Sequence, residues 1–112
     1  MAKVQIVKSL LEEIMKRFKG ESYEIIDLLE TLEKDPKKGK AVGQVAGVVI
    51  KELKYKGFRF YFITDGYKIK VLAVNELNDL LIKFVRMSDK KTQQKTIDEI
   101  KDILRKLGEE GF

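Results

Sequence analysis

The first segment of the chain has the pattern of a short strand followed by a helix. Apolar residues occupy alternate positions in Lys3–Lys8, which predicts an edge strand, although this segment could also form the first turns of a longer helix. Ser9 and Glu12 have the spacing of a capping box and predict that a helix begins here. Gly20 predicts its end. The apolar stripe of this helix consists of Leu11, Ile14, Met15 and Phe18.

A second helix is predicted over Ser22–Lys34, and a loop follows it. Asp35-Pro36 ends the helix, because proline disfavours helical geometry in the residue before it. Two helices separated by a short break predict a helical hairpin. Residues 37–43 are basic and contain glycine, which predicts a flexible loop without the glycine spacing of a phosphate-binding loop. The apolar face of the second helix consists of Ile25, Ile26, Leu29 and Leu32.

The middle of the chain predicts two adjacent strands. Val45–Tyr55 contains a β-branched apolar run, and Lys56-Gly57 predicts a turn after it. Phe58–Ile63 is the clearest strand of the chain, because it is rich in aromatic residues and alternates. Its side chains divide between two faces, with Phe58, Phe60 and Phe62 on one and Arg59, Tyr61 and Ile63 on the other.

The last part of the chain predicts further strands and a closing helix. Asp65-Gly66 is typical of a type I′ hairpin turn, so the hairpin is expected to continue into Lys68–Val74. Leu80–Met87 predicts another strand, and Ser88-Asp89 offers a helix N-cap. The closing helix is predicted over Lys90–Leu107, where apolar residues recur at helical spacing.

These elements predict a single α+β domain over residues 1–112. Its order is a short N-terminal strand, a helical hairpin, an antiparallel β-meander of three or four strands, and a C-terminal helix. Helices are expected to cover one face of the sheet and to leave the other face open. An open sheet face that carries basic side chains would be a binding surface.

The composition excludes several chemistries. The chain has no Cys and no His, so cysteine- or histidine-based metal sites and the common nucleophilic triads are excluded. Catalysis would have to use Lys, Arg, Tyr, Asp, Glu or backbone groups, and neither a metal nor another cofactor is expected. No segment resembles a signal peptide or a membrane span, which predicts a cytoplasmic protein without a membrane partner.

Positive charge is concentrated in the middle of the chain. The net charge is +5, and 37% of residues are charged, against about 25% in a typical domain. Residues 36–70 hold 9 basic and 2 acidic residues, a balance of +7, whereas residues 1–35 hold 6 basic and 8 acidic residues. A polyanion such as nucleic acid would explain this field, and so would a lysine-rich solvated surface.

Three segments carry a resemblance to a known family. They are Glu52-Leu53-Lys54, Gly57–Phe62 and Phe84–Gln93, in this order and spacing. Together they resemble the RelE/ParE toxin superfamily, and its HigB-like branch most closely. The chain departs from that pattern at Lys54, where the branch has arginine, and over residues 65–79, which are expected to form an extra hairpin arm.

The resemblance implies the toxin of a type II toxin–antitoxin system that cleaves ribosome-bound mRNA. Arginine and lysine would then stabilise the charge that develops on the phosphate, and lysine, tyrosine or glutamate would transfer protons. The candidate catalytic residues are Arg59, Arg86, Lys54, Glu52 and Tyr61. Alternatively, both arginines form ion pairs with Glu52 or Asp89, and the tyrosine packs in the sheet.

Nucleic-acid contacts are expected from lysines around this site. They are Lys51, Lys56, Lys90, Lys91, Lys37 and Lys38. The implied partners are a cognate antitoxin, mRNA on the ribosome and a second copy of the chain in a homodimer. The alternative function is a non-catalytic member of the same fold that binds nucleic acid or a protein, including a gyrase inhibitor of the ParE type.

Overall fold

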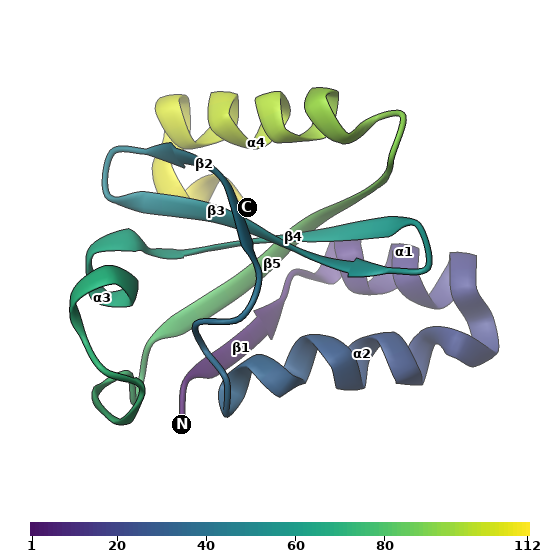
Figure 1. Cartoon of the computed structure of the whole chain (residues 1–112). Coiled ribbons are helices and arrows are strands. Elements are labelled where there is room, and N and C mark those ends of the chain that lie inside the picture. Colours follow the sequence, from purple (N-terminus) through teal and green to yellow (C-terminus); the bar gives the residue numbers. More distant parts are fainter.

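The computed structural model describes all residues from Met1 to Phe112 and shows an α+β fold around one mixed sheet. The sheet has five strands in the order β1-β5-β4-β3-β2 (Figure 1). The N-terminal strand β1 pairs in parallel with β5, and all other neighbours are antiparallel. The strands are β1 (Lys3–Ile6), β2 (Lys40–Val45), β3 (Val48–Tyr55), β4 (Phe58–Asp65) and β5 (Leu81–Asp89).

The helices confirm the predicted hairpin and closing helix. Short 3-10 turns follow α1, α2 and α4, and another precedes β5. None of the helices has the length and apolar character that a bilayer span requires. The helices are α1 (Lys8–Phe18), α2 (Ser22–Glu30), α3 (Gly66–Val71) and α4 (Gln93–Leu107).

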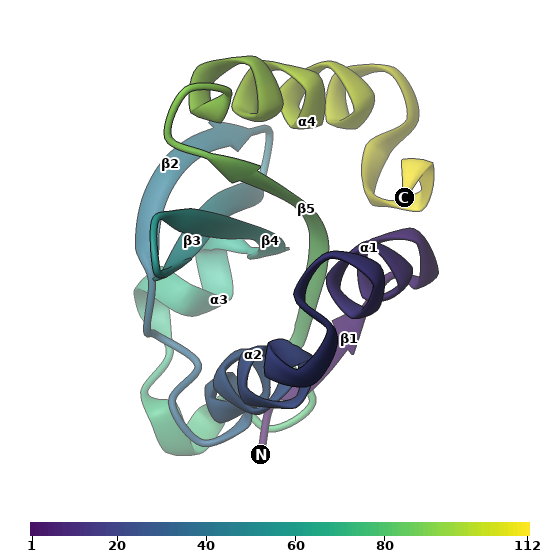
Figure 2. The same cartoon turned by 90° about the vertical axis from the view of Figure 1, so that its right-hand side faces the viewer.

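The expectation of one open sheet face is wrong, because helices cover both faces. In Figure 2, α1 and α2 lie on one side of the sheet and α4 lies on the other. On the α1/α2 face, the ring of Phe18 packs edge-on against Phe58 with a centroid distance of 5.1 Å, and Phe62 packs against Phe84 at 4.9 Å. Across the α4 face, the buried residues Ile97, Ile100 and Leu104 form the apolar stripe of α4. The amphipathic pattern of α4 thus requires a partner surface, and the sheet provides it.

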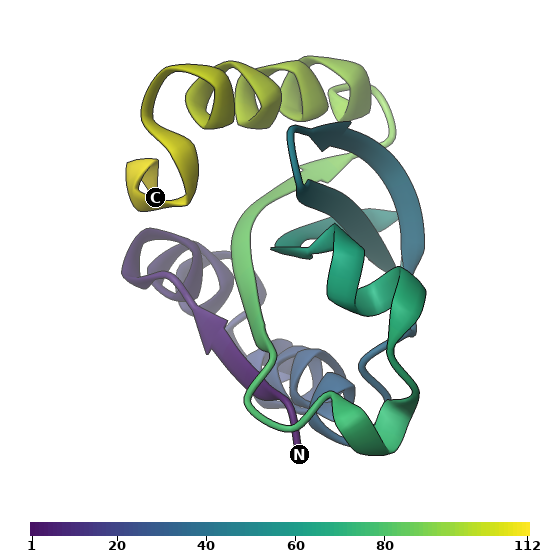
Figure 3. The same ribbon diagram turned by 90° about the vertical axis from the view of Figure 1, so that its left-hand side faces the viewer.

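The predicted hairpin arm after β4 is also wrong. Asp65 does not form a turn between strands; its carboxylate accepts a hydrogen bond from the Lys68 amide at 3.0 Å and caps α3. Asp-Gly suits both a hairpin turn and a helix start, and the capping bond decides between them here. The segment predicted as strand over Lys68–Val74 is therefore mainly helix α3, which lies beside the β2–β3 hairpin (Figure 3).

Three other boundaries differ from the sequence prediction. Residues 40–43 of the predicted loop belong to β2, because the chain pairs along β3 from Lys40 to Val45. Helix α1 begins at Lys8 and receives no side-chain cap, so the capping box at Ser9 and Glu12 does not form. The second helix ends at Glu30 in α geometry, with a 3-10 turn over Thr31–Glu33 before Pro36. The fourth strand of the predicted meander is thus β2 rather than the arm after β4.

Candidate functional site

The candidate catalytic residues lie together on the α4 face of the sheet. Strand register places Glu52 opposite Tyr61, and Tyr61 opposite Arg86, in one row across β3, β4 and β5. Lys54 and Arg59 are opposite each other in the next row. Since paired residues and residues two positions apart on a strand share a face, all five side chains belong to the same surface.

Glu52 and Arg59 form an ion pair inside the protein. The Arg59 Nε lies 3.7 Å from the Glu52 Oε2, and the two side chains are 10% and 1% exposed. Neither of these two atoms has a hydrogen-bond partner. Arg59 donates from Nη1 to the Gly57 carbonyl at 3.1 Å, which holds the guanidinium near the β3–β4 turn. A buried pair with this loose geometry gains little against the cost of removing both charges from water.

Tyr61 lies on β4, between Glu52 on β3 and Arg86 on β5. It is completely buried, and its hydroxyl lies 2.7 Å from the Ser88 hydroxyl in a hydrogen bond. Burial raises the pKa of the Tyr61 phenol, and the bond to Ser88 opposes that effect. The phenol therefore holds its proton at neutral pH, as a proton donor must.

Arg86 is the more accessible arginine of the site. Its Nε donates to the Glu99 carboxylate on α4 at 3.0 Å, and its Nη1 donates to the Val85 carbonyl at 2.8 Å. The guanidinium also lies 5.2 Å from the centre of the Phe112 ring. The Arg86 side chain is 30% exposed, three times the fraction for Arg59.

Helix α4 closes the site through polar contacts as well as apolar ones. Gln93, in its first turn, donates from Nε2 to the Glu52 Oε1 at 3.3 Å, and Glu99 pairs with Arg86 two turns further on. Gln93, Ser88 and Glu99 are members of the site that sequence reasoning missed. In the sequence, Ser88 could be recognised only as a possible helix cap. The two α4 residues lie too far along the chain from the strand residues that they contact to give a local sequence pattern.

The lysines assigned to nucleic acid do not all face this site. Lys51 is on the opposite face, 6% exposed, and donates to the Lys37 carbonyl at 2.9 Å, so its ammonium does not face the solvent. Burial lowers the pKa of Lys51. Lys56 pairs with Glu21 at 3.3 Å. Lys37 and Lys38 are exposed on the loop before β2.

Lys90 and Lys91 lie beside the site, but they do not open α4 as expected. Both are exposed in the connection after β5, and α4 begins only at Gln93. In this connection the Asp89 carboxylate accepts hydrogen bonds from the Thr92 amide and hydroxyl, each at 2.9 Å. The hydrogen bond from the Thr92 backbone amide is the main reason that the pKa of the Asp89 carboxylate is lowered. Lys54 is exposed as well, and none of Lys54, Lys90 and Lys91 forms an ion pair.

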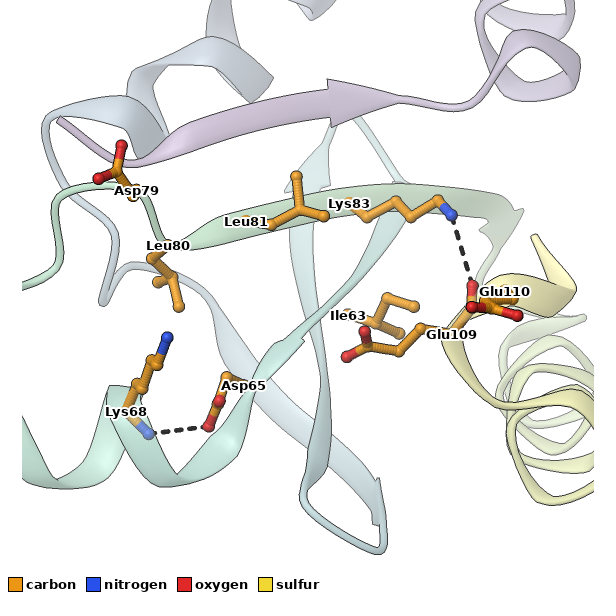
Figure 4. Close-up of a pocket in the computed structure, with 9 residues that line it drawn as sticks. All are labelled: Ile63, Asp65, Lys68, Asp79, Leu80, Leu81, Lys83, Glu109 and Glu110. Carbon is orange, nitrogen blue, oxygen red and sulfur yellow. Dashed lines mark hydrogen bonds between the residues drawn. The ribbon is translucent and has the colours of Figure 1, made fainter.

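A separate pocket lies at the other end of the α4 face. It has a volume of about 390 Å³ and contains none of the predicted site residues (Figure 4). Lys83 extends along it and donates to the Glu109 carbonyl at 3.4 Å and to the Phe112 carbonyl at 3.1 Å. The pocket is lined by acidic, basic and apolar residues: Ile63, Asp65, Lys68, Asp79, Leu80, Leu81, Lys83, Glu109 and Glu110.

No group of acidic side chains is arranged to hold a metal ion. The site consists of two arginines, a lysine, a glutamate and a tyrosine on three adjacent strands, with α4 across them. Comparison with known proteins finds no matching family model, no matching curated protein and no matching solved structure.

Proposed function

We propose that the protein is a RelE-like toxin that cleaves RNA, with the α4 face of the sheet as its active site. The observation that carries this proposal is the convergence of Glu52, Lys54, Arg59, Tyr61 and Arg86 on that face. Residues of these types are rarely placed between a sheet and a helix for stability alone, because burying charge is costly. Ribosome-bound mRNA and a cognate antitoxin belong to the same proposal as partners.

The chemistry would be attack of a ribose 2′-hydroxyl on the adjacent phosphate. The arginines would stabilise the additional negative charge on the phosphate, since a guanidinium donates fixed hydrogen bonds to phosphate oxygens. Tyr61 retains its proton and would donate it to the leaving 5′-oxygen, whereas Glu52 would accept the proton of the 2′-hydroxyl. This assignment requires neither histidine nor metal.

Access differs among these residues. Lys54 and Arg86 lie where RNA would meet them first, since Lys54 is exposed and Arg86 is 30% exposed. Glu52, Arg59 and Tyr61 are each less than 10% exposed. Reaction at these three residues therefore requires that α4 moves away from the sheet.

The test is induced expression of the wild type and of a Lys54→Ala/Arg86→Ala variant, with growth and mRNA integrity followed together. Both side chains reach solvent, so the variant should fold, which circular dichroism would verify. The matched control is Lys68→Ala/Lys70→Ala, which removes the same charge from the exposed side of α3. Growth arrest and mRNA cuts in the wild type and the control, but not in the variant, support the proposal. Absence of cuts from the folded wild type contradicts it.

A second candidate function is nucleic-acid binding without cleavage. It is favoured by the ion pairs of both arginines, Arg59 with Glu52 and Arg86 with Glu99, which leave only lysines free. A binding protein of this kind should lose RNA affinity by similar steps as Lys54, Lys90 and Lys91 are removed singly. The slope of log affinity against log salt should fall with each removal.

A further inference from the structure

The Arg86 guanidinium already holds an anion from its own chain. Nε donates to Oε1 of Glu99, while the Nη1 bond to the Val85 carbonyl fixes the guanidinium against the backbone of β5. The Phe112 ring lies 5.2 Å away on another side. The arginine is thus oriented by its own strand, and the carboxylate of α4 is a ligand to it. A phosphate oxygen is an acceptor of the same charge type.

The exposure of the two ion pairs shows which arginine can exchange its carboxylate partner for an anion from outside. The Arg86 and Glu99 side chains are 30% and 50% exposed, against 10% and 1% for Arg59 and Glu52. Partly exposed pairs contribute only about 0.2–1 kcal/mol. Separating a buried pair is much more costly, because each charge would be left without compensation. An incoming anion can therefore replace Glu99 on Arg86 while the Glu52–Arg59 pair stays intact.

Replacing Glu99 would also affect the position of α4. The helix has two polar anchors on the site, Gln93 to Glu52 at 3.3 Å and Glu99 to Arg86 at 3.0 Å. An anion that takes Arg86 removes one of these anchors. Binding at Arg86 and release of α4 are then coupled, and the coupling is reciprocal.

We propose that Glu99 is an internal competitor of RNA: in the free protein its carboxylate occupies the position on Arg86 that a phosphate of the RNA backbone takes on binding. This inference rests on the proposed function and adds its regulation. The free toxin is held in a closed state by α4, and the first phosphate contact weakens that closure. RNA gains access to Glu52, Arg59 and Tyr61 only after this exchange.

The test compares Glu99→Gln with Asp98→Asn. Both remove one negative charge from neighbouring positions of α4, but Asp98 is bonded to Gln94 on the helix itself and forms no hydrogen bond or ion pair with the sheet. A fluorescently labelled single-stranded RNA that is long enough to cross all strands of the sheet is titrated with each full-length variant at one fixed ionic strength. Glu99→Gln should tighten binding by a factor of about 1.4 to 5, which corresponds to the roughly 0.2–1 kcal/mol of a partly exposed ion pair. Asp98→Asn should change affinity less.

The same substitution in an Arg86→Ala background separates local competition from net charge. There, Glu99→Gln should have no larger effect than Asp98→Asn. Hydrogen exchange provides a second measurement: saturating RNA should speed amide exchange in α4 of the wild type. Equal gains for Glu99→Gln and Asp98→Asn, or slower exchange of α4 with RNA, would overturn the inference while leaving RNA binding intact. Absence of RNA binding and of mRNA cleavage by every variant would instead overturn the proposed function, and the inference with it.

Discussion

The two faces of the sheet are both covered by helices, but they enclose different kinds of side chain. The α1/α2 face is lined with phenylalanine, and Phe60, Phe62 and Phe84 are fully buried there. The α4 face places Glu52 and Arg59 under a helix, with one unbonded buried polar atom on each. Both faces are closed, so exposure alone does not distinguish them. The difference lies in how charge is enclosed: the buried Lys51 of the α1/α2 face donates to a carbonyl among aromatic contacts, whereas the α4 face holds a loosely paired glutamate and arginine.

This comparison indicates that the two faces serve different ends. Aromatic packing favours folding through apolar burial and edge-to-face contact. A loosely paired buried glutamate and arginine do little for stability, since apolar residues of similar volume would serve at least as well there. Proteins commonly retain such unfavourable groups where activity requires them. Stability is therefore expected to reside on the α1/α2 face, and the proposed activity on the α4 face.

The largest predicted effect is on the α1/α2 face. Phe60→Ala removes a ring that is 0% exposed and lies 6.2 Å from the ring of Phe18. We expect a loss of about 3–5 kcal/mol in the free energy of unfolding, because a large cavity remains. Urea denaturation measures it. Tyr67→Ala on α3, where the side chain is 70% exposed, is the control and should change stability by no more than about 0.5 kcal/mol. A loss below 1 kcal/mol for Phe60→Ala would mean that this face does not hold the fold.

The second prediction concerns the buried ion pair on the α4 face. Glu52→Leu alone leaves the Arg59 charge without its partner and should cost about 3 kcal/mol in the free energy of unfolding. The double variant Glu52→Leu/Arg59→Met removes both charges and should return to within about 1 kcal/mol of the wild type, or exceed it. Urea denaturation of the wild type, of both single variants (Glu52→Leu and Arg59→Met) and of the double variant completes the double-mutant cycle.

The stabilities of these variants test directly whether the two faces differ in their contribution to the fold. Recovery of stability in the double variant, with mRNA cleavage lost, would assign the pair to function. A double variant as unstable as Glu52→Leu would show that the pair supports the fold, and the contrast between the faces would fail. Lys54→Ala, on the same face but exposed, serves as the control that should leave stability unchanged.

The sequence revealed the faces of individual strands but not what covers them. The alternation in Phe58–Ile63 assigns the phenylalanines to one face and Arg59 and Tyr61 to the other, as observed. Local periodicity carries that information. The contact of Gln93 with Glu52 joins residues 41 positions apart, and no local pattern encodes it. The covered state of the site was therefore invisible in the sequence.

The two elements that were predicted incorrectly, β2 and α3, have a similar physical origin. Residues 40–43 have the glycine and lysine content of a loop, and they become part of strand β2 only by pairing with β3. Asp65-Gly66 fits two structures, and the helix α3 forms because the Asp65 carboxylate caps it. In both places long-range pairing or one side-chain bond outweighs the local preference, as edge strands and turns often permit.

The smallest predicted effect lies at the connection that carries the chain from β5 to α4. The pKa of Asp89 is lowered by hydrogen bonds from Thr92. Its ionised carboxylate therefore stabilises the folded state at pH values above the ordinary aspartate pKa of 3.8. That contribution is lost as the pH falls through the lower pKa of the folded state. Amide exchange in the first turn of α4 should therefore speed up on acidification, while α1 and α2 stay protected.

The variant Asp89→Asn keeps an acceptor oxygen but does not titrate. In this variant, amide exchange in the first turn of α4 should already be faster at neutral pH, and its dependence on acid should be weaker. Asp98→Asn, on the helix surface, should retain the wild-type acid dependence at this turn. If α1, α2 and α4 lose protection together at the same pH, the two faces open as one unit rather than separately.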